Sequence, residues 1–309
     1  MIVTLAGGVG AARMLAGLQL AFPPGELAAI VNTADDLTLH GLHISPDLDT
    51  VVYTLAGAIN PETGWGLAGE TWQAMDSLAR YRGITWFNLG DRDLGTHLYR
   101  TQRLGEDAPL HQICDEIARA WGLELTIMPM TDDEVRTRVT VAGEGEIGFQ
   151  EYFVERAHSV PVESVRFAGA DRATPAPGVL DAIASAAAIV IAPSNPVVSI
   201  GPILAVPGVR EALGRRRAQV AAVSPIIGGR ALKGPADRLL EELGHESSVV
   251  GVARLYADVA ATLVIDSIDA ERADEITATG MTPVVTDTVM SSPEIAAALA
   301  RTVVGATGA

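Results

Sequence analysis

The residue types able to do chemistry gather in short polar stretches that follow apolar runs. The first is the Gly-rich stretch AGGVGAAR at Ala6–Arg13, which lies between the apolar run Ile2–Leu5 and the helix-forming run Met14–Leu20. A strand, a Gly-rich turn and a helix in this order let backbone N–H groups approach a phosphate, and the positive end of the helix dipole favours its charge. Each hydrogen bond to a charged oxygen contributes about 1.5–3 kcal/mol. The stretch therefore predicts an anion-binding turn.

The spacing of this turn departs from that of a dinucleotide-binding loop. Gly8 and Gly10 match the first two glycines of that loop, but Arg13 stands where a third small residue would let the helix pack on the strand. The turn is compatible with phosphate binding or with a purely structural tight turn. It does not by itself name the ligand.

Two acidic stretches follow. Asp35 and Asp36 come after the apolar run Leu27–Val31, which we predict to be a second parallel strand. At the carboxyl end of such a strand these carboxylates could accept from a ribose hydroxyl, hold a divalent cation or cap a turn. The letters SPDLDT at Ser45–Thr50 precede a helix-like run, Val51–Ala56. They supply two carboxylates and two hydroxyls where a helix cap needs one oxygen, and this surplus indicates a site.

A charged stretch also precedes the predicted helix Leu94–Leu104. Its letters are GDRD, and a cap explains one aspartate, which leaves Arg92 free to bind an oxygen-rich ligand. We interpret His97 as structural, because none of the six histidines has metal-ligand spacing. Leu94 and Leu98 are expected to share the buried face of this helix.

Polar loops recur in the second half of the chain. The pair Ser194-Asn195 offers a hydroxyl and an amide just after the predicted strand Ala186–Ala192. A second Gly-rich, cationic loop follows the predicted strand Ala218–Val223 and ends at Lys233-Gly234. We expect this loop to suit a phosphate or to orient a base.

Positioning these stretches requires a scaffold that brings strand ends together. The alternation of strand-like and helix-like runs predicts an α/β fold with a doubly wound (Rossmann-like), mostly parallel sheet. Later strands are expected at Val249–Val252, Thr262–Ile265 and Thr282–Thr286, and a terminal helix at Ser292–Val304.

The pattern changes in the middle of the chain. Val135–Val141 alternates apolar and polar residues, as a half-exposed strand does, and Ile147–Val154 is expected to be a second strand across a turn. We predict that residues 125–167 form a small β-rich subdomain inserted into a core made of residues 1–124 and 168–309.

Composition narrows the function classes. The chain has 309 residues and a net charge of −16, which argues against wrapping nucleic acid or lying on anionic lipid. Binding an anionic nucleotide would then need local cations, either Arg side chains or a divalent metal. The single cysteine, Cys114, excludes an internal disulfide and a cysteine-based zinc cluster, and its neighbours place it in a helix core. With no recognisable targeting or spanning segment, we expect a soluble cytoplasmic protein.

Six stretches together resemble the 2-phospho-L-lactate transferase family of deazaflavin coenzyme (coenzyme F420) biosynthesis. They run nearly from end to end in this order: GGVGAAR at Gly7–Arg13, VNTADD at Val31–Asp36, SPDLDTVVYTLAG at Ser45–Gly57, LGDRDLGTHLYRT at Leu89–Thr101, PMTDDEVRTRV at Pro129–Val139 and APSNPVVSIGPILAVPG at Ala192–Gly208. The form with Trp65-Gly66 and Phe149-Gln150-Glu151 is most similar to the actinobacterial branch, which is associated with a phosphoenolpyruvate-derived donor.

The resemblance implies a reaction. A Mg²⁺-dependent enzyme would transfer a phosphoenolpyruvyl or 2-phospho-L-lactyl group from a guanosine diphosphate-linked donor. The acceptor would be the terminal hydroxyl of 7,8-didemethyl-8-hydroxy-5-deazariboflavin (Fo), and GMP would leave. The resemblance also implies a homodimer.

The same resemblance implies roles for individual residues. Asp49 and Arg92 would be the catalytic pair and would contact Fo together with Thr50 and Asp91. Asp36 and Asp49 would hold the metal, although the sequence leaves open whether Asp49 is a base or a metal ligand. The guanine nucleotide would lie on Gly7, Gly8, Gly10, Ser194, Asn195 and Pro196.

Two functions from other classes remain to be weighed. A regulatory nucleotide-sugar binder of the same superfamily would keep the Gly-rich loop and Ser194-Asn195, but it has no use for Asp49 with Arg92. A nicotinamide-dependent oxidoreductase is disfavoured by Arg13 at the third small position of the loop. The transferase is therefore the favoured hypothesis.

Overall fold

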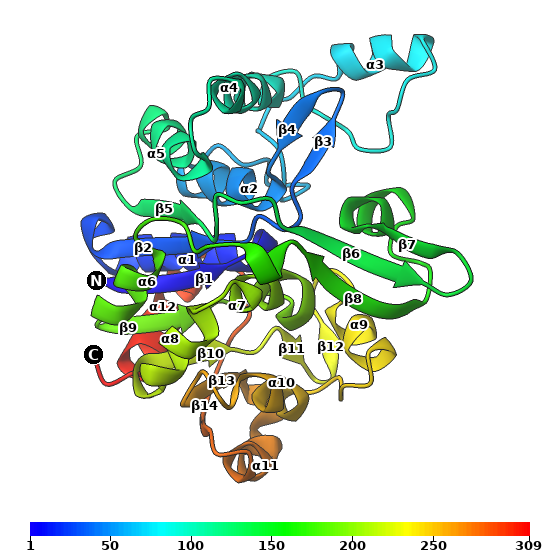
Figure 1. The fold of residues 1–309 in the computed structure, drawn as a ribbon. Helices are drawn as coiled ribbons and strands as arrows, with labels where there is room; N and C mark the ends of the chain where they lie inside the picture. The colour runs from blue at the N-terminus through cyan, green and yellow to red at the C-terminus, as the bar shows by residue number, and fades with distance from the viewer.

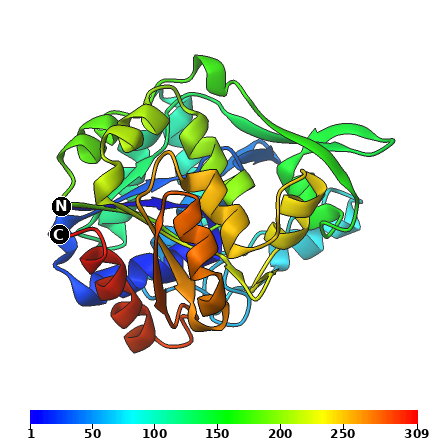
Figure 2. The same cartoon turned by 90° about the horizontal axis from the view of Figure 1, so that it is seen from below.

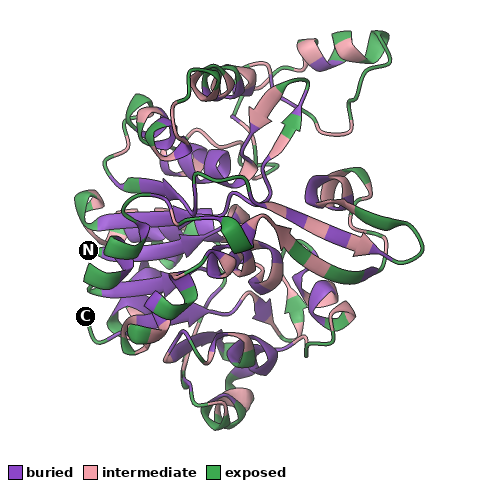
Figure 3. Ribbon diagram, viewed as in Figure 1, coloured by how far each residue is buried: buried purple, intermediate pink, exposed green.

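The computed structural model describes residues 1–309 and is built around a seven-stranded sheet (Figure 1). All neighbouring strands pair in parallel. From one edge to the other the strands are β14 (Thr282–Thr286), β13 (Thr262–Asp266), β10 (Val220–Val223), β9 (Ala188–Ile191), β1 (Ile2–Ala6), β2 (Leu27–Val31) and β5 (Thr126–Pro129). The strands are rich in Ala, Val and Ile because helices cover both faces of the sheet and leave its centre buried (Figure 3).

The strand order is that of a doubly wound fold. The chain begins at β1, continues outward through β2 to β5, and later returns to the other side of β1 to place β9. β1 therefore pairs with both β2 and β9, and the direction of winding reverses between β1 and β9. Ligands of such sheets bind outside the carboxyl ends of the strands at this switch point. The predicted fold class is confirmed.

Two hydrophobic cores lie on opposite faces of the sheet. Alternate strand residues feed them, so that Val3 and Leu5 enter one core while Ile2 and Ala6 enter the other. The helices on the first face are α6 (Val179–Ser185), α7 (Gly201–Ala205), α8 (Val209–Arg215), α9 (Ala236–Glu242), α10 (Val249–Tyr256) and α11 (Ala273–Ala278). Those on the second are α1 (Gly8–Ala21), α2 (Pro46–Leu55), α5 (Leu110–Ala120) and α12 (Pro293–Gly305), with α12 beside α1 in Figure 2.

A smaller layer stands above α2 in Figure 1. It holds the hairpin β3 (Leu37–Leu39) and β4 (Leu42–Ile44), the outlying helix α3 (Gln73–Arg80) and the helix α4 (Asp93–Gly105). A core of its own joins the hairpin to the loops beside α3 and α4. This layer positions α4 over α2.

The predicted β-rich insert is a three-stranded antiparallel sheet in the order β7 (Gly145–Gly148), β6 (Arg136–Val141), β8 (Val162–Ala168). β5 falls within the predicted range 125–167 but is an edge strand of the central sheet, so the antiparallel piece begins after it. The expected strand Ile147–Val154 is also wrong beyond Gly148. The chain turns there into a short π-helix, Glu151–Glu155, whose Tyr152 packs with Phe149 in a separate small core.

One predicted strand is a helix. Val249–Val252 forms the first turn of α10, where the Ser248 hydroxyl accepts from the N–H groups of Val250 and Gly251 at 3.2 and 3.1 Å. A short run of buried valines suits either a strand or a helix, and apolar periodicity alone does not separate the two. The N-cap serine decides it.

The buried face of α4 also differs from expectation. Leu98 is 57% exposed, whereas His97 and Arg100 are each 1% exposed. The helix therefore turns polar side chains inward, which no apolar-periodicity argument predicts. Two other expectations are confirmed, since Cys114 is buried in α5 and the terminal helix begins after its cap Ser292.

No single helix is long and apolar enough to cross a membrane. One bent pair, Pro196–Ala205 with Val209–Arg215, meets that criterion by length and composition only.

The contact between α1 and α12 yields a stability prediction. A Cβ on Gly17 would lie 2.4 Å from the Ala296 carbonyl oxygen, so Gly17→Ala must push the two helices apart. We expect it to lower the free energy of unfolding by about 1–3 kcal/mol, measured by urea denaturation. Gly95→Ala, in a helix with nothing within 4 Å, is the matched control and should be neutral or stabilising. Equal effects of the two substitutions would contradict the packing argument.

Candidate active site

A cavity of about 520 Å³ opens at the switch point of the sheet. Its wall is drawn from segments far apart in the chain: the turn between β1 and α1, the first turn of α2, and the loop after β9. Seven of the predicted site residues line it, namely Gly7, Gly8, Gly10, Asp49, Thr50, Ser194 and Asn195. The expected convergence of these strand ends on one crevice is therefore observed, while Pro196 is buried and absent from the cavity wall.

The glycines of the first turn allow close approach between protein segments. Gly8 has a φ of 71°, in the left-handed region. A Cβ on Gly10 would lie 2.2 Å from the Pro193 carbonyl oxygen, and the Ser194 hydroxyl donates to the Gly7 carbonyl at 2.8 Å. The loop after β9 thus packs directly on the Gly-rich turn. At least part of the glycine requirement is internal to the fold.

The side chain of Asp47, a residue of α2, lies at the N-terminus of α1. Its Oδ1 accepts from the Gly8 N–H at 2.9 Å, and its Oδ2 accepts from Asn32 Nδ2 at 3.0 Å. One N–H of the expected anion cradle is thus satisfied by the protein's own carboxylate. Burial raises the pKa of Asp47 to about 6, with the hydrogen bonds from Asn32 and Gly8 opposing the rise.

The Asp35 carboxylate has fewer hydrogen-bond partners than that of Asp47. It lines the cavity, and its buried Oδ1 has no hydrogen-bond partner. Burial, and then the charge of Asp47, raise the pKa of Asp35 well above its usual range. No basic side chain pairs with either carboxylate, although burying an unpaired charge is costly. Two such carboxylates with a free oxygen fit a hard divalent cation.

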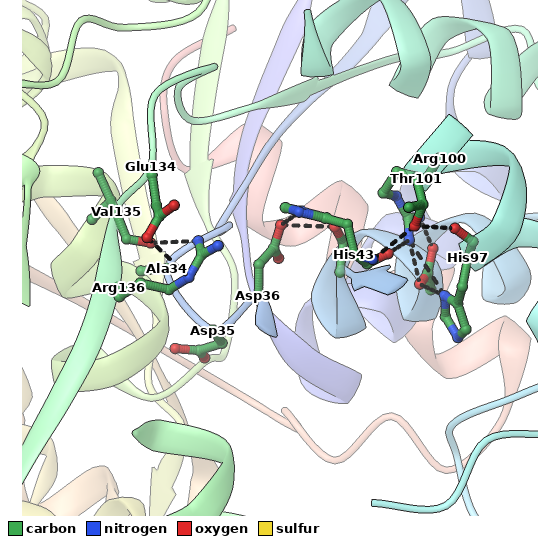
Figure 4. A network of polar contacts seen from close by, with 12 residues as sticks. Ala34, Asp35, Asp36, His43, His97, Arg100, Thr101, Glu134, Val135 and Arg136 are labelled. Carbon is green, nitrogen blue, oxygen red and sulfur yellow. Dashed lines mark hydrogen bonds and ion pairs between the residues drawn. The ribbon is translucent and has the colours of Figure 1, made fainter. Parts of the chain in front are cut away.

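Asp36 points elsewhere. Its Oδ2 accepts from the Ser45 hydroxyl at 2.7 Å and lies 2.9 Å from His43 Nε2, and Figure 4 shows it turned toward His43 while Asp35 points away. Asp36 is absent from the cavity wall. The sequence pairs Asp36 with Asp49 as metal ligands. The structure instead brings Asp35 to the cavity with Asp47, because adjacent residues of this turn project in different directions.

Asp49 is fixed from behind by α4. The buried Arg100 guanidinium donates to both Asp49 carboxylate oxygens, with 3.2 Å between Arg100 Nη1 and Oδ2. His97 Nδ1 lies 3.6 Å from the same Oδ2, and Figure 4 shows His97 and Arg100 converging. Burial raises the pKa of Asp49, and the Arg100 charge opposes that rise. Sequence analysis does not single out Arg100.

Asp93 and Tyr53 extend this buried group. The Tyr53 hydroxyl donates to Asp93 Oδ1 at 2.5 Å, and His97 Nε2 lies 3.3 Å from Asp93 Oδ2. Asp49, Asp93 and His97 are close enough together to hold a metal ion. However, Arg100 already neutralises Asp49, and Mg²⁺ prefers oxygen ligands. His97 still lines the cavity, and its spacing of four from Asp93 on one helix is the signal that sequence analysis missed.

Arg92 and Asp91 lie outside the cavity wall. The exposed Arg92 guanidinium donates to the Ala68 carbonyl at 2.6 Å, and Asp91 accepts from the N–H groups of Gln73 and Ala74 at 2.9 and 3.0 Å. Asp91 thereby caps α3. The charged loop before α4 is a brace between two loops in this structure, and its position does not support the predicted contacts of Arg92 and Asp91 with a ligand.

A large part of the cavity wall is aromatic. The chain holds only five Phe, four Trp and five Tyr, yet six of these side chains line this one space: Tyr53, Trp65, Trp86, Phe87, Phe149 and Phe153. Phe149 and Phe153 stack with ring centroids 5.4 Å apart and come from the segment that follows β7 in the insert. Such a wall suits a flat, polycyclic ligand.

Comparison with known proteins agrees with this architecture. The sequence model of the family described as 2-phospho-L-lactate transferase CofD matches residues 2–304. The chain belongs to this family. Proteins named phosphoenolpyruvate transferase are 46% identical over 97% of this chain and 96% of the relative in Streptomyces griseus, and 42% identical over the same shares in Mycolicibacterium smegmatis. The relative from Nocardia farcinica is 47% identical over 86% of this chain and 82% of its own.

Membership of the 2-phospho-L-lactate transferase family makes the chain a transferase. A crystal structure of a UPF0052 family member from Bacillus halodurans has the same fold, with a TM-score of 0.63 and 16% identity over 98% of both chains. At that identity the similarity speaks for the fold alone.

The Arg100–Asp49 pair predicts that two arginines of α4 contribute unequally to stability. Arg100→Met would leave Asp49 buried and unpaired, and we expect a loss of about 3–5 kcal/mol in the free energy of unfolding. Arg103→Met, three residues along the helix, removes only surface pairs with Glu106 and Glu116 and should cost under about 1 kcal/mol. Urea denaturation of both variants measures this. Similar losses in the two variants would show that the buried Arg100–Asp49 pair contributes no more to stability than the surface pairs of Arg103.

Asp47 predicts a pH dependence of stability. Its pKa is raised from 3.8 to about 6 in the folded protein, so its contribution is favourable below pH 3.8 and is lost as pH rises through 6. Asp47→Asn removes this loss of stability at higher pH, because an amide does not ionise. Between pH 4 and pH 7 the free energy of unfolding should shift by roughly 3 kcal/mol in favour of the variant. Stability curves that stay parallel over this range would contradict the raised pKa.

Proposed function

We propose that this chain transfers a phosphoenolpyruvyl or 2-phospho-L-lactyl group from a guanosine diphosphate-linked donor to the terminal hydroxyl of Fo, releasing GMP, in coenzyme F420 biosynthesis. The observation that carries the proposal is the single cavity at the switch point that is lined both by aromatic side chains and by buried carboxylates. The names of the relatives favour phosphoenolpyruvate as the source of the transferred group.

The aromatic wall supports Fo as the acceptor. A deazaflavin is a flat tricycle that can stack on rings such as Trp65 and Phe149, and aromatic contacts of this kind add about 0.5–1.5 kcal/mol each beyond burial. Asp49 lies in the same cavity and presents a carboxylate to an acceptor hydroxyl. Thr50, next to it, also lines the wall.

The Gly-rich turn and the loop after β9 support a nucleotide donor. The remaining N–H groups of the first turn of α1 face the switch point, where phosphates bind in doubly wound folds. Asn195 Oδ1 accepts from the Val197 N–H at 2.9 Å, which leaves its amide N–H₂ group to donate to a ligand. The bound nucleotide would lie against Gly7, Gly8, Gly10, Ser194, Asn195 and Pro196.

Asp35 and Asp47 would hold Mg²⁺ in this scheme. The unpartnered Asp35 oxygen and the absence of a basic partner for either carboxylate support them as the ligands in place of Asp36 and Asp49. When bound, Mg²⁺ would neutralise the donor phosphates and stabilise the charge that develops on them during transfer.

Asp49 would act as the base. The acceptor oxygen forms a bond to the donor's distal phosphorus, the bond from that phosphorus to the oxygen of GMP breaks, and the hydroxyl proton passes to the Asp49 carboxylate. GMP leaves with the bonding electron pair. A carboxylate accepts about four hydrogen bonds, so the contacts from Arg100 and His97 leave room for one from the acceptor hydroxyl. Positioning and charge neutralisation supply the rest of the rate.

The remaining parts of the proposal come from the resemblance and the composition. We propose a cytoplasmic homodimer with small-molecule substrates. The net charge of −16 supports the expectation that neither nucleic acid nor an anionic membrane is a partner.

The decisive experiment incubates the protein with Fo, Mg²⁺ and each donor, and detects the product mass together with GMP. We expect Asp49→Asn to lower turnover by about 10²–10⁴-fold, the usual worth of a positioned base, while Fo fluorescence still reports binding. Asp258→Asn, at an exposed pair with Arg210, is the control and should keep full activity. A thermal melt checks that Asp49→Asn is folded.

Two results would count against this function. Unchanged turnover in Asp49→Asn would remove Asp49 as the base. Nucleotide binding without any product from either donor would favour the regulatory binder instead.

A further inference from the structure

Lys233 is the only lysine in the chain, because the other 21 of the 22 Lys and Arg residues are arginines. It lies beyond the hairpin β11 (Ile226–Ile227) and β12 (Arg230–Ala231) and is part of the cavity wall. Four aspartates also line the cavity: Asp35, Asp47, Asp49 and Asp93. The other basic side chains in the lining are Arg13 and His97. The one lysine therefore lies in the cavity at the switch point.

The Lys233 ammonium reaches the beginning of α1. A Cβ placed on Gly64 would lie 3.6 Å from Lys233 Nζ and 3.5 Å from Val9 Cγ1. Val9 is the second residue of α1, so the ammonium and a side chain of the first helical turn both lie within 3.6 Å of the same point. The charge is thus near the helix end whose free N–H groups carry partial positive charge.

No carboxylate pairs with Lys233, although carboxylates line the same cavity. It takes part in no ion pair of the structure, and the same holds for Arg13. Asp49 pairs with Arg100, and Asp47 and Asp93 accept hydrogen bonds from Asn32 and Tyr53, whereas Asp35 Oδ1 has no partner. In a chain with a net charge of −16, an unpaired ammonium and a helix N-terminus at one end of a cavity favour an anion from outside.

We propose that Lys233 binds the diphosphate of the nucleotide donor, as a flexible point charge that closes over phosphates held at the first turn of α1. The proposal rests on the proposed function for the identity of the nucleotide, but the recognised chemistry is a diphosphate. Arg230, in β12 three residues before Lys233, is exposed as Lys233 is but lies outside the cavity wall, and it gives a matched comparison.

The first test compares Lys233→Gln with Arg230→Gln. Titration calorimetry with GDP should show at least about tenfold weaker binding for Lys233→Gln, because a hydrogen bond to a charged group is lost. Arg230→Gln should change the affinity less than about twofold, since a solvent-exposed charge outside the cavity contributes little. Unchanged melting temperatures confirm intact folds. Equal affinities of the two variants would overturn the proposal.

A second test uses the uniqueness of the lysine. Reductive ¹³C-methylation keeps the charge and labels only two amines, Lys233 Nζ and the α-amine of Met1. Met1 precedes the amino end of β1, away from the carboxyl ends that form the cavity, so its resonance is an internal reference. Lys233→Gln assigns the other resonance. GDP and inorganic pyrophosphate should both move the Lys233 signal and leave that of Met1 in place, whereas guanosine should move neither.

The outcomes separate the two proposals. GDP that binds, as shown by calorimetry, without moving the Lys233 signal would overturn the role of Lys233 and leave the proposed function standing. Pyrophosphate that moves the signal when GDP does not bind would support the role of Lys233 and overturn the proposed donor. A signal that neither ligand moves would overturn the role of Lys233.

Discussion

Burial of carboxylates around the first turn of α2 is the constraint on which this structure depends. Asp47 and Asp49 project from one helical turn into the space at the switch point, and Asp35 enters it from the loop after β2. Each needs compensation that a parallel sheet does not provide. Arg100 on α4 compensates Asp49, while the start of α1 and Asn32 compensate Asp47. The upper layer with α4 is therefore as necessary to the site as the sheet itself.

The sheet and its ligand edge could be predicted from sequence because their causes are local. Strands covered on both faces read as continuous apolar runs, and the polar residues that end them must meet at one edge. That reasoning predicts that Gly8, Asp49 and Asn195 meet at one edge of the sheet, and all three line the cavity.

Side-chain direction could not be predicted in the same way. The difference between Asp35 and Asp36 depends on how one turn is rotated, and the difference between Arg92 and Arg100 depends on how α4 leans over α2. Both are settled by long-range packing. The valines that begin α10 fail for another reason, because a buried helix and a buried strand leave the same apolar run. The sequence predicts well which segments of the chain reach the site, and poorly which side chains of those segments point into it.

The insert has a consequence for how such enzymes diversify. Phe149 and Phe153 reach the cavity from the segment between β7 and β8 of the antiparallel sheet, whereas the carboxylates and the Gly-rich turn belong to the parallel core. Part of the aromatic surface and the carboxylates are thus encoded in separable pieces of chain. Under the proposed function, exchanging the insert between homologues would change that part of the surface on which the acceptor stacks and leave the carboxylates of the core in place.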